Sequence, residues 1–553
     1  MAGIGTAETR LDGRAKVTGA ARYGSDPAIA KPAYGFLTTA AIARGQIANI
    51  DETRARAVPG VIDIFTHRNI GKIETGKTFA SGGYMGTSIA PMASAEIFHD
   101  GQIVALTVAD TFEAAREAAH RLDITYTPAT PSATFDSPGS KTVAAKLVSK
   151  SHEDPAVGDA SGAFAAAAVK TDAHYATATE HHNPIELFTT ACAWSNGKLT
   201  VWESSQNMWG FKNGLALQLG ISPEDIHVVS PFVGGAFGSR GSLTQRTAIV
   251  ALAAKKVGRP VKLMTTRDQG FTVATYRAET RHHMKLGASR DGKLVSLSHE
   301  AFEVTSRADN YMVAGTDAST RLYGCPNVFS KVSIVHADRN TPGFMRSPPE
   351  TPYIFALECA MDELAYALEM DPVQLRKIND TKIEPIKGLP YSSRSLVECF
   401  DQAGNAFGWA ERDHRPRSMR DGDWLVGWGT ATTMYPSHIA PATARVTLYP
   451  NGTAKVQSAT HEIGQGIFTV CALIVADKLG IDPQKVSVEV GDSDLPPAPV
   501  AGGSNSTASV GNAVAKACEE IRLKRSQGAN GAIEAYAENI PKGAPENGIQ
   551  KLY

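Results

Sequence analysis

The residues with the clearest chemical potential lie in a glycine-rich turn near the end of the chain. His461–Gly466 reads His-Glu-Ile-Gly-Gln-Gly and precedes a helical apolar pattern over Ile467–Leu479. A glycine-rich turn that opens a helix exposes backbone N–H groups, and the helix dipole adds partial positive charge there. Such a turn can bind an anion, although many turns carry glycine for steric reasons only.

The elements around this turn occur twice in the same order. Each copy has an Asn-Gly hairpin, a polar turn, a helix, a Leu-Gly-Ile-x-Pro break, a strand, a Gly-Gly loop and a second helix; the copies span residues 192–257 and 444–514. This order predicts an internal duplication. Helix N-termini near Gly235, Gly466 and Ser509 would together surround one large anionic ligand. The alternative is a repetition that serves packing only.

Polar side chains accompany these turns. Gln206 and Gln465 occupy the same place in the two copies, and a neutral amide both donates and accepts hydrogen bonds. Such an amide suits a ligand with oxo groups, although either glutamine alone reads as a turn residue. Arg346, in a loop pinned by prolines, is suited to clamp an oxyanion, the alternative being a solvated surface arginine. His181 and His182 are adjacent on an expected strand and point to opposite faces, so we expect a structural role for them.

Composition excludes several classes of protein. The 553 residues carry a formal net charge of -1, with 42% hydrophobic and 20% charged residues. This balance argues against a nucleic-acid or membrane-surface role driven by bulk charge, and the apolar runs are too short to span a bilayer. The sequence has no P-loop, no Gly-x-Ser-x-Gly elbow, no His-Glu-x-x-His helix and no paired cysteines, so we predict no metal-ligating residues. The six scattered cysteines and the absence of a signal peptide at the start indicate the cytoplasm.

The order of predicted elements gives an α+β protein of several parts. Residues 1–126 alternate strands and helices, with a turn, short strand and turn over residues 10–26. Residues 127–160 are rich in Pro, Ser, Ala and Thr, which indicates a connector and not a folded element. The two copies lie in residues 161–412 and 424–553. The last helix is expected from about Gly511, and residues 526–553 read as a linker.

Five motifs together resemble a known family. Asp12–Gly19, Gly234–Gly238, Phe344–Pro352, His461–Gly466 and Gly502–Val514 look like the molybdenum-cofactor subunit of xanthine dehydrogenase and aldehyde oxidase enzymes, in the same order over nearly the whole chain. The resemblance implies an N-terminal α/β hammerhead domain followed by two molybdopterin-binding domains, the second incomplete. It agrees with the duplication.

The resemblance also implies a cofactor and partners. The cofactor is a molybdenum–pterin dinucleotide, in the cytosine form, while iron–sulfur clusters and FAD belong to an iron–sulfur subunit and a FAD subunit. Gln206 would lie near the molybdenum oxo group and Arg346 beside the active site. Backbone amides of Gly235, Ala236 and Phe237 would line the metal's pocket. The residues that would hold the pterin are Gln465, Gly466, Ala508 and Ser509.

The reaction implied is hydroxylation of a small molecule with oxygen from water, with two electrons leaving to the partners. The family's general base is a glutamate in a Gly-x-Gly-Glu-type stretch close to the C-terminus. The sequence has no such stretch, so no catalytic residue is assigned, and Glu462 is a poor substitute because it belongs to the pterin-binding turn. Gln269 stands where purine-oxidising members have an acidic residue, which, with Pro348-Pro349, favours an aldehyde or a small N-heterocycle over xanthine.

Two other hypotheses remain open at this point. One is a non-catalytic truncated fragment that binds only cofactor or partner subunits, because family subunits are considerably longer. The other is a dinucleotide-binding dehydrogenase, which the loop Gly234–Gly238 disfavours because it is Gly-Gly-x-x-Gly and not Gly-x-Gly-x-x-Gly. The alternative to a cytoplasmic location is the periplasm, reached by export together with a partner.

Overall fold

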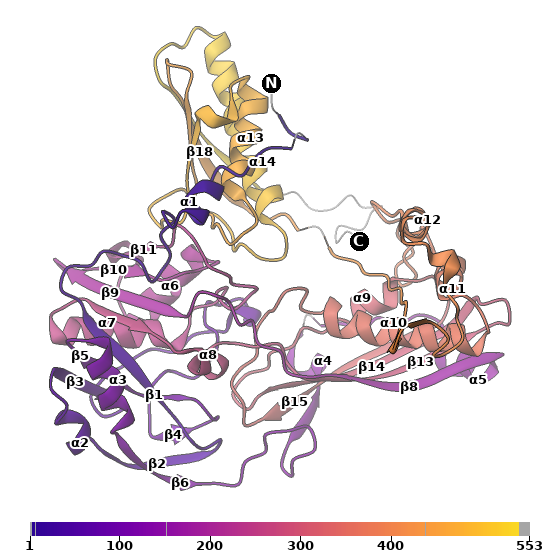
Figure 1. Ribbon diagram of the computed structural model, residues 1–553, viewed down its shortest axis with the longest axis horizontal. Coiled ribbons are helices and arrows are strands. Elements are labelled where there is room, and N and C mark those ends of the chain that lie inside the picture. Colours follow the sequence, from indigo (N-terminus) through magenta and orange to yellow (C-terminus); the bar gives the residue numbers. More distant parts are fainter. Residues whose placement is uncertain (1–2, 6, 151, 437, 541–553) are drawn as a thin grey trace.

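A computed structural model describes the chain except residues 1–2, 6, 151, 437 and 541–553. It has an α+β architecture arranged in three lobes (Figure 1). None of the helices among the described residues is both long and apolar enough to cross a membrane.

A seven-stranded sheet joins the N-terminal region to the first repeat. Its strands run in the order β11-β10-β9-β12-β1-β5-β3. The N-terminal members are β1 (Ala33–Thr39), β3 (Val61–Thr66) and β5 (Ile103–Ala109). The repeat supplies β9 (Thr189–Ser195), β10 (Lys198–Trp202), β11 (Ile226–Val229) and β12 (Val261–Met264). All seven residues of β5 are buried, as expected for an apolar strand covered on both faces. Because β1 pairs in parallel with β12, the two regions share one core.

Helices and a smaller sheet complete this lobe. Helix α3 (Phe112–His120) begins at the predicted cap, since the Thr111 side chain accepts a hydrogen bond from Ala114 N. The other helices are α2 (Thr53–Arg56), α6 (Met208–Leu219), α7 (Gln245–Val257) and α8 (Arg267–Val273). A three-stranded sheet contains β2 (Gly45–Asp51), β4 (Glu96–Ile97) and β6 (Asp123–Pro128).

The second lobe is a five-stranded sheet covered by helices. The strand order is β7-β15-β14-β13-β8, with β7 (Lys141–Ala144), β8 (Val169–Thr177), β13 (Thr280–Ala288), β14 (Leu294–Ser306) and β15 (Val328–Ala337). Its helices are α4 (Ala145–Val148), α5 (Ala160–Ala166), α9 (Thr316–Arg321), α10 (Glu350–Ala367), α11 (Pro372–Ile378) and α12 (Leu396–Phe407). The prediction that residues 127–160 contain no folded element was wrong. Strand β7 pairs with β15, and this pairing outweighs the loop-like composition.

The third lobe repeats the topology of the first repeat. It contains β18 (Ala442–Leu448), β19 (Ala454–Gln457), β20 (Val486–Glu489), β21 (Ile533–Asn539), α13 (Ile467–Leu479) and α14 (Ser506–Ser526). The order β20-β19-β18-β21 matches β11-β10-β9-β12 strand for strand. In both sheets a hairpin is flanked by one parallel and one antiparallel neighbour. The predicted duplication is therefore confirmed at the level of the fold.

Three local predictions were wrong. Residues 13–17 form helix α1 (Gly13–Val17) where a short strand was expected. Helix α14 begins at Ser506, five residues before the expected start, and residues 526–553 include β21, which pairs with β18. A two-stranded hairpin, β16 (Arg420–Asp421) and β17 (Trp424–Leu425), lies at the expected boundary between the cofactor-binding regions.

Candidate cofactor and substrate site

A cavity of about 560 Å³ lies where the three lobes meet. Its size is within the usual range for small-molecule sites, about 300–1,000 Å³. The N-terminal region contributes residues 78–80 and 85–86, and the first repeat contributes Gln206, Gly238, Gly241 and Ser242. The second lobe adds residues 311, 313–315, 317–318, 341–344 and 348–350, and residues 500, 502–503 and 505 come from the second repeat. The site thus depends on segments more than 400 positions apart in the sequence.

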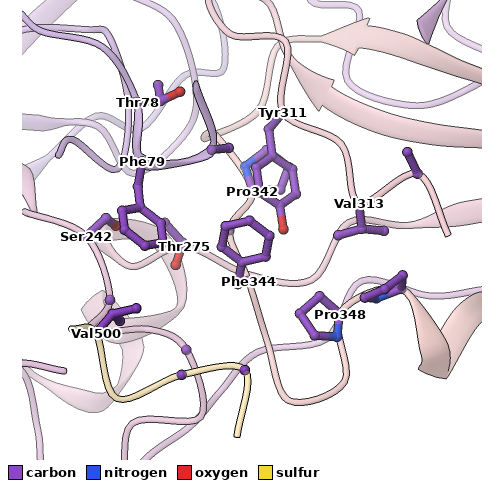
Figure 2. Close-up of a pocket in the computed structure, with 18 of the residues that line it drawn as sticks. Thr78, Phe79, Ser242, Thr275, Tyr311, Val313, Pro342, Phe344, Pro348 and Val500 are labelled. Carbon is purple, nitrogen blue, oxygen red and sulfur yellow. The ribbon is translucent and has the colours of Figure 1, made fainter. Parts of the chain in front are cut away.

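One wall of the cavity is aromatic (Figure 2). The Phe344 ring meets Phe79 edge-on, with centroids 5.9 Å apart, and packs at 69° to Tyr311 at 5.5 Å. The Tyr311 hydroxyl is buried and has no hydrogen-bond partner among the described residues. Burial raises the pKa of Tyr311 well above its usual value, so the hydroxyl keeps its proton and remains a hydrogen-bond donor.

Gln206 fixes the side of the cavity where the repeats meet. Its Nε2 donates to Ala501 O at 2.8 Å, and its Oε1 accepts from Gly238 N at 3.0 Å and Arg240 N at 3.3 Å. The backbone adds a second link to Ala501, since Ala501 N donates to Gln206 O. A primary amide nitrogen has two hydrogens, so one remains for a ligand. Gln206 is the one predicted site residue that lines the cavity among the residues described.

Gly235, Ala236 and Phe237 lie in the loop that leads to Gly238. The expectation that Gly235 stands at a helix N-terminus was wrong, because α7 begins at Gln245. Gly238 has φ of 113°, and a Cβ there would lie 2.0 Å from Phe344 O. The loop therefore needs glycine at this position to approach the aromatic wall.

Arg346 is joined to the same loop through its backbone. Its N–H donates to Phe237 O at 2.9 Å, and its own carbonyl accepts from Arg277 Nη2 at 2.6 Å. The Arg346 side chain is exposed. Two sequence-predicted residues, Phe237 and Arg346, are thus brought together through their backbones.

The buried carboxylate of Glu186, which bonds to the loop Gly234–Gly238, was not anticipated from the sequence. Glu186 Oε2 accepts from Gly234 N at 2.7 Å, and Oε1 accepts from Ser204 Oγ at 2.5 Å and Gly24 N at 3.0 Å. The buried Arg240 side chain contacts the same loop, and its Nε donates to Gly235 O at 3.1 Å. Burial lowers the pKa of Arg240 to about 10, which still leaves it charged at neutral pH.

The turn of the second repeat is organised locally. Gln465 folds back on its own turn, accepting from Ile463 N at 2.8 Å and donating to His461 O at 2.6 Å. Gly466, with φ of 84°, is the N-cap of α13. Gln465 and Gln206 therefore occupy equivalent places but make different contacts, and residues 461–466 do not contribute to the cavity lining within the described chain.

Ala508 and Ser509 lie inside the first turn and a half of α14. Ser509 N already donates to Asn505 O at 2.8 Å, and Ser509 Oγ accepts from Ala440 N at 2.9 Å. The residues of this segment that reach the cavity precede the helix: Val500, Gly502, Gly503 and Asn505. The part of this segment that lines the cavity is therefore the loop around Gly502-Gly503, and not the first turn of α14.

The two repeats also bond to each other directly. His461 Nε2 accepts from Met208 N, the first residue of α6, at 2.8 Å, and Glu462 O accepts from Val233 N at 3.0 Å. Burial lowers the pKa of His461 to about 3, so the ring is neutral and its Nε2 is free to accept. The turn of the second repeat thus bonds both to the N-terminus of α6 and to the glycine loop of the first repeat.

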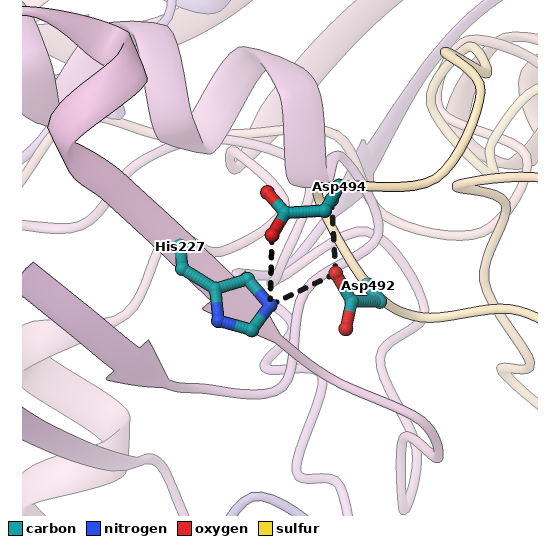
Figure 3. A group of neighbouring side chains, drawn as sticks. All are labelled: His227, Asp492 and Asp494. Atoms are coloured by element: carbon teal, nitrogen blue, oxygen red, sulfur yellow. Dashed lines mark hydrogen bonds and ion pairs between the residues drawn. The ribbon is translucent and has the colours of Figure 1, made fainter.

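A charged cluster lies at the same junction (Figure 3). His227 Nε2 donates to Asp492 Oδ1 at 2.9 Å and lies 3.8 Å from Asp494 Oδ2. These three side chains offer ligand atoms within 4.8 Å of one another. However, Asp492 Oδ1 also accepts from Asp494 N, and Lys212 Nζ lies 4.0 Å from Asp494. Because a cation is already present, we interpret the cluster as an ion-pair contact between the repeats.

Two further residues, Glu350 and Gln269, differ in their position relative to the cavity. Glu350 lines the cavity, is 6% exposed, and its Oε2 has no partner among the described residues; burial raises its pKa. Gln269 is turned away: its Nε2 donates to Leu37 O at 2.9 Å, and its Oε1 accepts from Thr266 N. The structure therefore gives no support to Gln269 as a substrate contact.

Comparisons with known proteins agree with this architecture. Residues 18–130 match the aldehyde oxidase and xanthine dehydrogenase a/b hammerhead domain, and residues 143–380 and 402–544 each match a molybdopterin cofactor-binding domain. The chain is 34% identical over 527 residues to the aldehyde oxidoreductase molybdenum-binding subunit PaoC of Escherichia coli O157:H7, covering 94% of this chain and 70% of the relative. It is 27% identical to the xanthine dehydrogenase molybdenum-binding subunit of the same organism, covering 88% and 68%.

Solved structures share the fold. The aldehyde oxidoreductase from Desulfovibrio gigas superimposes with a TM-score of 0.77 at 22% identity, over 96% of this chain and 62% of that chain. The chain thus spans about two thirds of the length of these relatives. Fold and site define a molybdopterin-binding protein with a hammerhead domain. The chain belongs to the aldehyde oxidase and xanthine dehydrogenase family, among the molybdenum-binding subunits.

Proposed function

We propose that the chain is the molybdenum-cofactor subunit of a hydroxylase that oxidises an aldehyde or a small N-heterocycle. The oxygen comes from water, and the electrons pass to iron–sulfur and FAD partner subunits. The observation that carries this proposal is the cavity between the repeats, which has Gln206 and an aromatic wall on its surface. The division at residues 126, 160, 412 and 424 is part of the same proposal.

The residues around the cavity fit a cofactor of this kind. Three buried side-chain atoms on its lining have no partner among the described residues: Tyr311 Oη, Glu350 Oε2 and Asn505 Oδ1. A buried polar atom without a partner is costly, so these atoms favour a polar ligand at the site. The cofactor, a molybdenum–pterin dinucleotide, would supply two-electron oxidation chemistry when bound. Its cytosine form is part of the proposal.

The chain's own residues would bind and orient. Gln206 donates its remaining N–H to the cofactor, and the loop containing Gly235, Ala236 and Phe237 presents backbone amides. The Arg346 guanidinium lies beside the reacting groups. Gln465, Gly466, Ala508 and Ser509 do not line the cavity, so they would hold the pterin from beyond it, on the side of the second repeat. No general base is assigned, because the sequence has no Gly-x-Gly-Glu stretch.

The aromatic wall of the cavity favours a flat apolar substrate with one polar group. Phe79, Phe344 and Pro348 provide flat apolar contacts, and the Tyr311 hydroxyl offers one hydrogen bond. An aromatic aldehyde or a one-ring heterocycle matches this combination better than xanthine, which carries polar atoms around its whole edge.

The test is to co-express the chain with its partners and the cofactor-assembly machinery. Purified protein should contain molybdenum and a pterin in stoichiometric amounts, and turnover should be faster with benzaldehyde than with xanthine. Cofactor without turnover would indicate a subunit that only binds. The absence of both molybdenum and pterin would refute the proposal, and export of the assembled complex would decide between cytoplasm and periplasm.

A further inference from the structure

The N-terminal segment, residues 10–26, contacts both cofactor-binding repeats. Helix α1 lies against the lobe that contains α13 and α14 (Figure 1). Leu11 N donates to Thr469 Oγ1 at 3.0 Å, and Arg10 Nη2 donates to Gly464 O at 2.5 Å. The segment therefore begins on the second repeat, although the chain then continues into the hammerhead region.

Lys16 makes the central contact with the second repeat. Its Nζ lies 2.9 Å from Glu462 Oε1 and forms a second ion pair with Asp12. The Glu462 side chain is fully buried and that of Asp12 nearly so, at 0% and 1% exposure, while that of Lys16 is 23% exposed. Lys16 is thus one cation shared by two buried carboxylates.

Glu462 in turn holds the glycine turn. Its Oε1 accepts from Gly464 N at 2.8 Å, and its Oε2 accepts from Ile467 N, the first residue of α13, at 3.0 Å. Its carbonyl accepts from Val233 N in the loop of the first repeat. The Glu462 carboxylate therefore sets the turn and the helix start, while the backbone carbonyl of the same residue bonds to the other repeat.

The charge state of Lys16 supports this arrangement. Burial lowers the pKa of Lys16, but the hydrogen bonds to Asp12 and Glu462 outweigh that effect and raise it overall. The Nζ also lies 5.6 Å from the centroid of the Phe232 ring, which stacks on Phe468 of α13. Lys16 is therefore charged and held in place from several sides.

The same segment reaches the first repeat a few residues later. Gly24 N donates to Glu186 Oε1 at 3.0 Å, and Glu186 Oε2 accepts from Gly234 N. A Cβ on Gly24 would lie 2.7 Å from Ser204 Oγ and 2.9 Å from Ser204 N, so the close approach requires glycine. One carboxylate in each repeat thus joins the segment to a glycine loop.

We propose that residues 10–26 form an N-terminal clasp that positions both cofactor-binding loops, with Lys16 as the positioning residue for the turn His461–Gly466. Lys16 acts through Glu462 and does not itself contact the cofactor. The role in cofactor retention rests on the function proposed above, whereas the effect on the turn is a property of the chain alone.

The first experiment measures the turn directly. Site-resolved hydrogen exchange on the full chain would compare wild type with Lys16→Met, Lys16→Arg and Asp12→Asn. Lys16→Met should accelerate exchange of the Gly464 and Ile467 amides by about tenfold or more, because the buried Glu462 carboxylate is left without its cation. Lys16→Arg should restore most of the protection because it keeps the charge, and Asp12→Asn should have a smaller effect because the Lys16–Glu462 pair remains.

Amides in the middle of α13 provide the internal control. If Ala472 and Val475 exchange faster by the same factor, Lys16 is a general stabilising residue and the positioning role is overturned. Unchanged exchange at Gly464 and Ile467 in Lys16→Met would also overturn it. The lysine control is Lys72→Met, since Lys72 is 80% exposed and pairs with Glu74 on the surface.

A second variant tests the other half of the clasp independently. Gly24→Ala should accelerate exchange at Gly234, while Gly13→Ala, whose Cβ would only meet Arg10 Cβ at 3.6 Å, should not. Equal protection of Gly234 in Gly24→Ala and wild type would remove the first repeat from the proposal.

The third readout links the clasp to the cofactor. In protein co-expressed with partners and cofactor machinery, molybdenum should leave Lys16→Met about 10- to 100-fold faster than wild type during dialysis, with rescue in Lys16→Arg. Equal retention would overturn the retention role alone. If wild type itself holds no molybdenum, the proposed function fails, while the exchange experiment still decides whether the clasp exists.

Discussion

The two repeats share one strand order but stabilise their loops with different charges. In the first repeat, Glu203 and Arg246 form a buried ion pair beneath the sheet, and Glu186 lies beside Arg240. In the second, Glu462 is paired with Lys16, which is 446 positions away. The first repeat thus contains its own cations, and the second obtains one from the N-terminus. The two repeats therefore share a fold, although their buried carboxylates are paired with cations from different parts of the chain.

The equivalent glutamines show the same divergence. Gln206 bonds across the junction to Ala501, whereas Gln465 bonds only within its own turn. The first repeat therefore contributes the side chain that joins the halves, and the second contributes a self-contained turn. Substitutions at matched positions should have unequal effects, which makes the comparison testable.

The largest effect is expected at the ion pair that the second repeat lacks. Glu203→Gln leaves Arg246 buried with a neutral partner, and breaking a buried pair costs about 3–5 kcal/mol. Both side chains are only 2% exposed. The opening free energy of β9 and β10, measured by native-state hydrogen exchange, should fall by that amount.

The matched control for Glu203 is Ser458, the residue that follows β19 as Glu203 follows β10. Ser458 Oγ donates to Thr443 O at 2.9 Å, so Ser458→Ala should lower the opening free energy of β18 and β19 by only about 1 kcal/mol. Equal losses in the two repeats would contradict the claimed difference.

A pair of glycines, Gly238 and Gly464, separates the effect of steric contact from that of backbone strain. Gly238 and Gly464 have nearly the same φ, 113° and 112°, but a Cβ on Gly464 would meet nothing within 4 Å. Gly464→Ala should cost about 1–3 kcal/mol from the backbone conformation alone. Gly238→Ala adds the clash with Phe344 O and should cost more, as measured by urea denaturation. A smaller loss for Gly238→Ala would show that the loop has room to move.

The His461 contact predicts acid sensitivity. The pKa of His461 is about 3 in the folded chain, below the ordinary histidine value of 6.5, so the unfolded chain binds the extra proton between these values. The contribution of neutral His461 to the free energy of unfolding is complete above pH 6.5. It is lost as the pH falls towards 3, by about 1.4 kcal/mol per pH unit. His461→Gln keeps an acceptor for Met208 N and should lower the slope of stability against pH by that amount. An unchanged slope would remove His461 as a determinant.

The smallest effect, of opposite sign, is expected at His227. Its hydrogen bond to Asp492 raises the pKa of His227, so its contribution is complete below pH 6.5 and is lost as the pH rises through the raised value. Because both side chains are more than a third exposed, the contribution should be below about 1 kcal/mol. The melting temperature of His227→Gln should differ from wild type more at pH 6 than at pH 9. A larger difference at pH 9 would reverse the assignment.

The sequence predicted the repeats well because their signals are local. Asn-Gly turns, the helical period of Ile467–Leu479 and the Thr111 cap each lie within one element, and the structure confirms them. The strand β7 and helix α1 were missed because they are stabilised by distant partners, β15 and the lobe of α13. Glu186 and Tyr311 carried no motif, and their roles depend on loops that meet only in the folded chain.

The clasp also has a consequence for biosynthesis. Lys16 is synthesised before Glu462, which follows 446 positions later. At about 5–20 residues per second, the delay is on the order of tens of seconds. During that time the N-terminal segment has no docking partner in the second repeat, so the two sides of the site come together only late in translation. Loading of a large cofactor would therefore follow synthesis of the lobe that contains α13 and α14.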